Sequence, residues 1–522
     1  MPRTEKNLKL FFYFSLAFMS AEIFSLFAYF QPFSANFFAF AVALSALCLT
    51  LYRLEYGLLL IFGDLLINSK GYLLAVHFAG GEIPIRLLIF VILMSVWLAH
   101  SLLNPISLWS KIKVFFQAPE KKIFTIAFFV LLGGILIGTL NGFFWQQNSF
   151  NNFFLDLNGW LYFFIFLPLF FSDKKAGFWR RLVLVFASGI FWLFLKTAFL
   201  LYFFAHFSPE IVYLLYRWLR TSGVGEATLI QAGFYRLFFQ SYIFILPAWY
   251  LSLGLMIVYF QQFGRIAWQK TVFYLYLVIG LLSSFLLLVS FSRSFWLAAA
   301  LGLSAAALLA GRPIRIFFLW LFSWSLSLIM IILAVVLIAG IVKFPWPPTK
   351  AGQNSLTAYS ERIAEIKNEP AASSRWQLWP VLWSEIRQAP YLGRGFGAVI
   401  IYQSADPRIK NSTTDGSYQT YAFEWGWLDI WLKTGIIGLI AYAGIFVIFF
   451  WQTGRSFSLE LRRKLPNLTY LAIIAGLGSS ALALAAVNFF TPYLNHPLGI
   501  GLLLILIYSL VNKKEWLDRS TC

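Results

Sequence analysis

Three arginines and one glutamate in this sequence stand beside apolar stretches or within its one long polar segment. Arg236 precedes an apolar stretch, and Arg293 lies in the motif SFSRSFW between two such stretches. Arg375 and Glu424 belong to the polar segment. Guanidinium groups bind phosphate through paired hydrogen bonds, and a carboxylate against an apolar wall can serve as a general base. These residues therefore indicate a site for an anionic ligand with a proton acceptor.

Each of these residues also has a purely structural interpretation. Arginines at the ends of membrane helices usually extend to the lipid headgroups, which would account for Arg236 and Arg293. Arg375 would then be a solvated residue on a helix face, and Glu424 would be a surface charge. Both interpretations remain open at the level of single residues.

The composition indicates that membrane helices position these residues. The chain has 522 residues, of which 60% are hydrophobic and 12% are charged, whereas a soluble domain is about half apolar and about a quarter charged. The net charge of +19 is assigned to loops on the cytoplasmic side rather than to nucleic-acid binding. We therefore predict an all-α polytopic protein of the cytoplasmic membrane with about 12 to 14 membrane helices, each about 20 residues long.

Apolar stretches of the required length define the expected spans, and the first is read as an uncleaved membrane helix. The spans are 10–31, 34–52, 55–77, 84–103, 122–142, 152–171, 182–206, 237–260, 271–291, 295–311, 315–341, 428–452, 467–489 and 495–511.

The distribution of Lys and Arg predicts the orientation. With the N-terminus inside, most basic residues of the short connecting segments fall on the cytoplasmic side. Both termini are then cytoplasmic, and the polar segment at 342–427 is extracytoplasmic. Four regions result, which are the N-terminal helices 1–230, a membrane core 231–341 with Arg236 and Ser292–Arg293, the outer loop 342–427, and the C-terminal helices 428–522.

The outer loop is expected to be partly helical. Ser360 would cap one short surface helix, and Ser373 or Ser374 a second, amphipathic one that Pro380 bends. Gly393, Gly395 and Gly397 predict a tight turn more than a phosphate loop, because no strand precedes them. The apolar stripe of the second helix would consist of Leu378, Leu382, Trp383 and Ile386.

Ionisable residues within the spans are costly in lipid and draw attention as site residues. Asp64 and Lys196 could pair or line a cavity, and the sequence does not decide between these. His496 is a weaker candidate at the extracytoplasmic face. No His, Cys, Asp or Glu spacing typical of a metal site is present, so we expect chemistry that needs no metal or cofactor. The in-span residues of this kind are Glu22, Asp64, Asp156 and Lys196.

Three motifs together resemble the O-antigen ligase and O-antigen polymerase superfamily of bacterial envelope glycosyltransferases. In that family a Ser-Arg pair opens an apolar span. A loop follows with an Arg, a Trp four residues on, and a Pro-x-x-Gly-x-Gly turn. A His or Glu then precedes a Gly-x-x-Gly by eleven residues. The matching residues are Ser292–Arg293, Arg375 with Trp379, Pro390 with Gly393 and Gly395, and Glu424 before Gly435 and Gly438, while Arg236 matches more loosely.

The resemblance implies a GT-C-like fold and a metal-independent, inverting glycosyltransferase. Its donor would be a polyisoprenyl-pyrophosphate-linked glycan, and its acceptor a hydroxyl on a glycan, lipid or protein at the outer face of the membrane. Arg236, Arg293 and Arg375 would bind the pyrophosphate, and Glu424 would be the base. Ligases proper commonly carry His at the position of Glu424, so ligase and polymerase both remain open. The alternative from another class is a transporter or flippase of lipid-linked oligosaccharide.

Overall fold

A computed structural model describes most of the chain, and the described residues are mainly helical. They also form three short antiparallel hairpins. The surface helix predicted behind Ser360 lies outside the described part. The described ranges are 3–174, 177–230, 234–263, 271–308, 313–346, 370–404 and 417–512.

Eleven helical segments among the described residues are long and apolar enough to cross a membrane. Each coincides with one of the predicted spans, which confirms a polytopic, mostly helical membrane protein. They lie in α1 (Arg3–Phe30), α2 (Ala35–Tyr52), α4 (Ile85–Leu103), α6 (Pro119–Leu140), the run α7 (Phe150–Trp160), η3 (Leu161–Ile165) and α8 (Phe166–Phe171), α9 (Phe178–His206), α11 (Ile245–Phe263), α12 (Thr271–Val289), α14 (Pro313–Val342), α18 (Gly426–Leu461) and α19 (Leu468–Val487).

The remaining three predicted spans correspond to shorter helices, α3 (Leu54–Ile67), α13 (Arg293–Leu308) and α20 (Pro497–Val511). The span predicted at 55–77 is wrong in its length, because α3 has only 14 residues. The side-chain oxygen of Asn68 accepts hydrogen bonds from the N–H groups of Gly71 at 2.9 Å and Leu73 at 3.2 Å. These bonds stabilise a turn in place of further helix.

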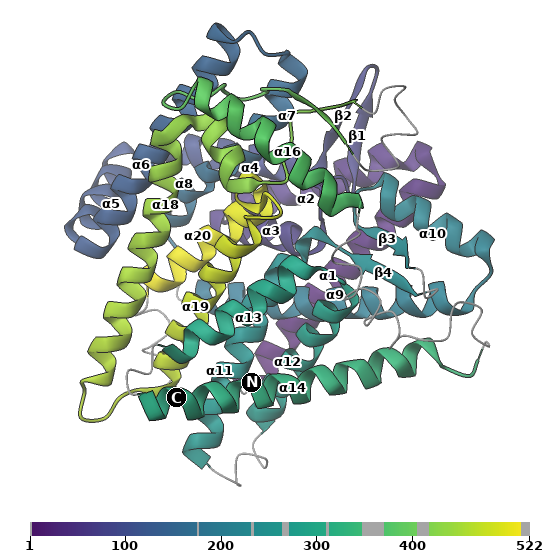
Figure 1. Ribbon diagram of the computed structural model, residues 1–522, viewed down its shortest axis with the longest axis vertical. Helices are drawn as coiled ribbons and strands as arrows, with labels where there is room; N and C mark the ends of the chain where they lie inside the picture. The colour runs from purple at the N-terminus through teal and green to yellow at the C-terminus, as the bar shows by residue number, and fades with distance from the viewer. Residues whose placement is uncertain are drawn as a thin grey trace.

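Short elements connect the long helices, and Figure 1 shows β1 and β2 at the upper right and β3 and β4 beside α10. They are η1 (Pro32–Ser34), β1 (Ala75–Phe78), β2 (Gly81–Pro84), α5 (Pro105–Gln117), the π-helix η2 (Asn141–Trp145), α10 (Pro209–Thr221), β3 (Glu226–Leu229), β4 (Tyr235–Phe238), η4 (Gln240–Phe244), α16 (Pro370–Gln388), β5 (Ile400–Gln403), β6 (Ser417–Thr420) and η7 (Tyr493–Asn495).

The hairpin β3–β4 corrects the all-helical expectation for one site residue. Arg236 was predicted at the mouth of a helix but lies on β4, opposite Thr228. Its neighbour Leu237 is buried opposite Ala227. This alternation of polar and apolar residues is the strand period, and it turns Arg236 to the face away from the buried pair.

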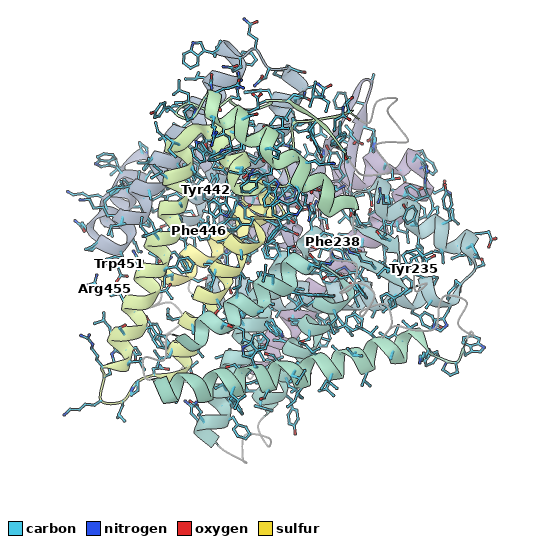
Figure 2. All side chains as sticks on the ribbon, in the orientation of Figure 1. Tyr235, Phe238, Tyr442, Phe446, Trp451 and Arg455 are labelled. Atoms are coloured by element: carbon cyan, nitrogen blue, oxygen red, sulfur yellow. The ribbon has the colours of Figure 1, made fainter. Side chains whose placement is uncertain are left out.

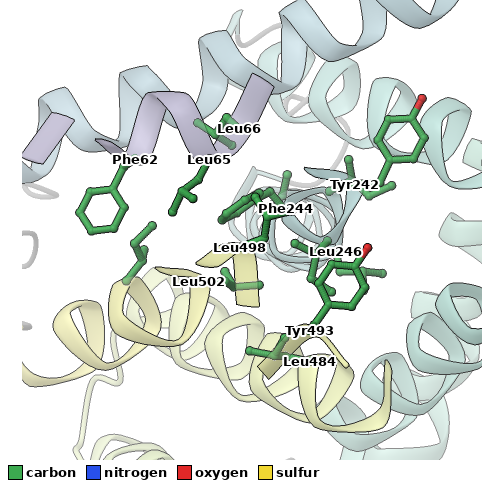
Figure 3. Packing of buried hydrophobic residues seen from close by; sticks show 14 of the residues in the cluster. Phe62, Leu65, Leu66, Tyr242, Phe244, Leu246, Leu484, Tyr493, Leu498 and Leu502 are labelled. Carbon is green, nitrogen blue, oxygen red and sulfur yellow. The ribbon is translucent and has the colours of Figure 1, made fainter. Parts of the chain in front are cut away.

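The main core lies where short helices from both halves of the chain meet. Figure 3 shows Leu65 of α3, Phe244 of η4 and Leu498 of α20 gathered in one cluster, with Leu484 of α19 below them. All four side chains are buried at 1% exposure or less. The N-terminal and C-terminal helices therefore share one core, and the loops at its ends are held together.

A second, smaller apolar cluster lies under α16, which crosses the upper end of α18 in Figure 1. Leu378, Leu382 and Ile386 are buried in it, as the predicted stripe requires, and the half-buried Trp383 packs against it. The helix begins at Pro370 and not at Ser373 or Ser374. Proline suits the first position of a helix because its fixed φ is already helical.

Candidate functional site

Arg375 and Glu424 form an ion pair at the surface of the α16 cluster. Arg375 lies on α16, and Glu424 stands just before the first turn of α18. The Nε–H of Arg375 donates a hydrogen bond to Oε2 of Glu424. A second hydrogen bond holds the two elements together, because Trp425 Nε1–H donates to the backbone oxygen of Arg375 at 2.9 Å. Two residues that were predicted independently are therefore held together.

Arg236 contacts the turn that carries Arg293. Its Nε–H donates to the backbone oxygen of Ser290 at 2.8 Å. The turn is tight, with Phe291 at φ 46° and the hydroxyls of Ser292 and Ser294 3.1 Å apart. Arg293 is the first residue of α13 directly after this turn. The local hydrogen bonding expected from the flanking serines is present. It stabilises the turn from which the side chain of Arg293 projects.

The segment 488–496 between α19 and α20 contacts both arginine-bearing regions. At one end, the ring of Phe490 lies 6.1 Å from that of Trp425, beside Glu424. At the other, the ring of Tyr493 lies 5.8 Å from that of Phe295, in the first turn of α13. One short stretch of chain thus contacts Trp425, which follows Glu424 in sequence, and Phe295, which lies two residues after Arg293.

The pKa of Tyr493 is affected by charged residues near the Arg236–Arg293 region. Its hydroxyl donates to the backbone oxygen of Gln240 at 2.9 Å, next to β4. Burial raises the pKa of Tyr493, the carboxylate of Glu226 raises it further, and Arg236 lowers it. The guanidinium of Arg236 is therefore close enough to act electrostatically on Tyr493 of this segment.

The three glycines of the outer loop form a structural turn. Gly393, Gly395 and Gly397 have φ values of 71°, 73° and 79°, a region that glycine occupies without steric cost. A Cβ atom on Gly395 would lie 2.2 Å from the backbone nitrogen of Gly142 in η2. The expected tight turn is present, and its lack of side chains lets the loop pack directly against the backbone of a membrane helix.

The same turn covers a break in α18. Gly435 departs from helical geometry with φ 67° and ψ −174°. The loop supplies hydrogen bonds at this point, because Arg394 N–H donates to Leu432 O at 2.6 Å and Ile436 N–H donates to Pro390 O at 3.1 Å. The loop thus satisfies backbone groups that the break leaves without helical partners.

A buried group of three charges lies beneath the turn, and the sequence interpretation did not assemble it. Lys433 Nζ lies 2.5 Å from Asp156 Oδ1 and 2.7 Å from Asp429 Oδ1. Asp156 also accepts from Gly397 N–H at 2.9 Å, and Asp429 accepts from Asn495 Nδ2 at 2.5 Å. The spacing of four residues between Asp429 and Lys433 could have predicted this pair. The group ties the glycine turn, α18 and the segment 488–496 together.

The other ionisable residues within the spans have partners of their own. Asp64 accepts from Arg86 Nε–H at 2.6 Å, and Lys196 donates to Glu22 at 2.5 Å. The alternative in which Asp64 pairs with Lys196 is therefore wrong. All four side chains are buried. Opposite charges at this distance are the usual way in which a folded membrane protein accommodates such residues.

His496 has a structural position at the start of α20. Its Nδ1 accepts from Leu498 N–H at 3.4 Å as the helix N-cap. Burial, together with the positive charges of Arg86 and Lys70, lowers the pKa of His496 to about 3. The ring is therefore neutral at physiological pH and is available as an acceptor, which is what the cap requires.

The fold and its membrane-crossing helices define a polytopic membrane protein. Within it, residues 278–443 match the family model described as O-Antigen ligase, and the chain carries an O-antigen ligase family domain over that stretch. The domain contains Arg293, Arg375 and Glu424, while Arg236 lies before it. The predicted resemblance is confirmed. No curated protein matches the chain.

Proposed function

We propose that this protein is an inverting glycosyltransferase, ligase-like or polymerase-like, which moves a glycan from polyisoprenyl pyrophosphate to an acceptor hydroxyl. The O-antigen ligase family domain implies a glycan transferase with lipid-linked substrates. The observation that carries the finer proposal is the contact of segment 488–496 with Phe295, two residues after Arg293, and with Trp425, the residue after Glu424. It supports a cationic leaving-group site and a proton acceptor within one catalytic site.

In this proposal the arginines stabilise the charge that develops on the departing pyrophosphate. The acceptor oxygen attacks the anomeric carbon from the face opposite the pyrophosphate, the carbon–oxygen bond to phosphate breaks, and the configuration inverts. Arg236 and Arg293 hold the leaving group, a role in which fixed cationic donors are effective. Glu424 accepts the proton of the acceptor hydroxyl. Arg375 positions Glu424 and adds positive charge.

The proposed reaction uses neither a metal ion nor another cofactor, because guanidinium groups take the place of a divalent cation at the pyrophosphate. Among the described residues, no group of three or more His, Cys, Asp or Glu side chains could hold a metal. A reaction assay with a chelator present tests this part directly, and loss of transfer on chelation would contradict it.

We place the site at the outer face of the cytoplasmic membrane, with the bilayer as the surrounding partner and with no nucleic acid involved. The distribution of Lys and Arg supports this orientation. Contacts support the grouping of segments on one side, because Arg181 pairs with Glu55 at 3.0 Å and Lys111 pairs with Asp173 at 2.6 Å. These pairs join segments that the charge pattern assigns to one side.

The experiment is transfer by the purified protein in liposomes. The donor is the lipid-linked glycan that organic solvent extracts from envelopes of cells lacking the protein, and the acceptor is the glycan that remains. Mass spectrometry should find a covalent product with the wild type and none with Arg293→Ala, while Arg217→Ala, at an exposed arginine of α10, keeps activity. Full transfer by Arg293→Ala would reject the proposal, and movement of unaltered donor across the bilayer would favour a flippase.

A further inference from the structure

A cluster of aromatic rings stands directly beside the Arg375–Glu424 pair. The ring of Trp425 lies 5.3 Å from that of Trp376 and 4.7 Å from that of Trp379, both in edge-on arrangements. Trp376 and Trp379 lie 6.5 Å apart, and Phe490 lies 6.1 Å from Trp425 on the other side. Three indoles are thus gathered at one end of α16.

Two of these indoles are exposed although the helix has a buried face available. Trp376 is 65% exposed and Trp379 is 39% exposed, whereas Trp425 is buried at 7%. The aliphatic residues of the same helix point inward, since Leu378 and Leu382 are at 2% and 0%. A patch of exposed aromatic rings can mark a place where a ligand, another protein or the membrane binds.

The composition of the outward face distinguishes among possible occupants. A helix that lies on the lipid directs its aliphatic residues toward the membrane, but α16 keeps them inside. Its outward face instead combines Trp376 and Trp379 with exposed polar residues, namely Gln377, Ser384 and Arg387. Flat apolar rings among hydrogen-bonding groups suit a sugar ring, which has an apolar C–H face and hydroxyls at its edge.

We propose that Trp376 and Trp379 bind a sugar ring of the acceptor glycan by stacking, next to the hydroxyl that reacts. This inference rests on the proposed function and assigns the acceptor side of the same site. Trp425 connects the platform to the chemistry, because it follows Glu424 in sequence and its Nε1–H donates to Arg375 O at 2.9 Å.

The assignment to the acceptor follows from which charges lie nearby. The donor pyrophosphate is placed at Arg236 and Arg293, on the β4 and α13 side of segment 488–496. The indoles lie on the other side, with the carboxylate that takes the acceptor proton. A sugar on Trp376 and Trp379 therefore belongs to the molecule whose hydroxyl meets Glu424.

A direct test is saturation-transfer NMR on the full-length protein in deuterated detergent. The probe is the oligosaccharide released by mild acid from the solvent-extracted envelopes, which contain the acceptor glycan. Irradiation of aromatic protons should saturate sugar C–H protons with the wild type. The variant Trp376→Ala/Trp379→Ala should lose this transfer. Trp451→Ala should retain it, because Trp451 is 51% exposed but lies on the part of α18 far from α16 in Figure 2.

Steady-state kinetics provide a second test. A purely structural role of the two indoles would not change KM for the acceptor selectively. The double variant should raise KM for the acceptor about tenfold, the effect of losing one aromatic contact of ordinary strength. KM for the lipid-linked donor should be unchanged, and Trp376→Tyr/Trp379→Tyr should restore most of the affinity because tyrosine keeps a ring. Equal thermal unfolding temperatures for the two variants show that folding is not the cause.

The outcomes separate this inference from the proposed function. Absence of transfer by the wild type rejects the function itself. A wild type that is active, with NMR and acceptor KM unaltered in the double variant, rejects only the platform. A double variant in which only the KM for the donor rises also overturns the acceptor assignment. A double variant whose only defect is weaker binding to liposomes of plain phospholipid overturns it too, because the indoles would then bind the membrane.

Discussion

The guanidinium of Arg375 is hydrogen-bonded to the carboxylate of Glu424 across 49 residues of chain. Two structural elements with separate origins, the helix α16 and the start of α18, are therefore joined at the position where the proposed reaction needs a base. Their side chains are 35% and 51% exposed, so the pair is open to a substrate that approaches from outside.

Removing this pair should affect turnover much more than stability. Exposed ion pairs contribute roughly 0 to 1 kcal/mol, so Arg375→Ala and Glu424→Gln should each leave the free energy of unfolding within about 1 kcal/mol of wild type. Turnover should fall at least about a hundredfold for Glu424→Gln, since it loses the general base. The double variant should lose less than the product of the two single losses, and fully multiplicative losses would show that the two residues act separately.

Gly395→Ala should unfold the outer loop from the membrane helices. The new Cβ atom would lie 2.2 Å from Gly142 N, at a backbone φ of 73°. We expect a loss of roughly 3 kcal/mol in thermal unfolding, from strain and overpacking together. The matched control is Gly444→Ala in α18, where a Cβ meets nothing within 4 Å. That change should stabilise slightly, and equal behaviour of the two variants would contradict the packing argument.

Lys433→Met should be among the most damaging single substitutions outside the site. It leaves Asp156 and Asp429 buried next to each other without their cation, which typically costs about 3 to 5 kcal/mol. Adding Asp156→Asn and Asp429→Asn to it should recover much of the loss, since buried ion groups can often be replaced by neutral ones. Unfolding in detergent by circular dichroism measures both, and a triple variant less stable than Lys433→Met would be inconsistent with this explanation.

The depressed pKa of His496 predicts a loss of stability in acid. The folded protein keeps the ring neutral down to about pH 3, whereas the unfolded chain takes up the proton near pH 6.5. Stability from this group is therefore complete above about pH 6.5 and falls as the pH is lowered toward 3. At about pH 5 the loss is about 2 kcal/mol.

The control for this effect is His496→Asn, since asparagine is a good N-cap and does not titrate. Its unfolding temperature should change less between about pH 7 and about pH 5 than that of the wild type. Parallel curves for the two proteins would mean that other groups dominate the acid response.

The sequence predicts the number and place of the long membrane helices well, because apolar length is a local property. It also predicts that Arg293, Arg375 and Glu424 belong to one family domain, since short motifs in a fixed order carry that information. The partners of buried charges are different in kind. Asp64 of α3 pairs with Arg86 of α4, and Lys433 of α18 pairs with Asp156 of α7. No spacing within one helix encodes such pairs between helices.

The hairpin that carries Arg236 shows the same limit at smaller scale. Four-residue strands are too short for a period to be read against a background of apolar residues. The end of α3 at Ile67 depends on side-chain bonds from Asn68 that only a folded turn makes possible. The presence of the membrane helices was thus predictable from the sequence, whereas the residues at which they end were not.

The turn at 390–397 is hydrogen-bonded to α18 at two points, from Ile436 N–H to Pro390 O and from Arg394 N–H to Leu432 O. A one-residue insertion or deletion in it would put these bonds out of phase and push a side chain into the place of Gly395. Loops of enzymes usually change specificity by changing length. In this protein we expect such changes in length to lie outside 390–397, where they leave the hydrogen bonds to α18 intact.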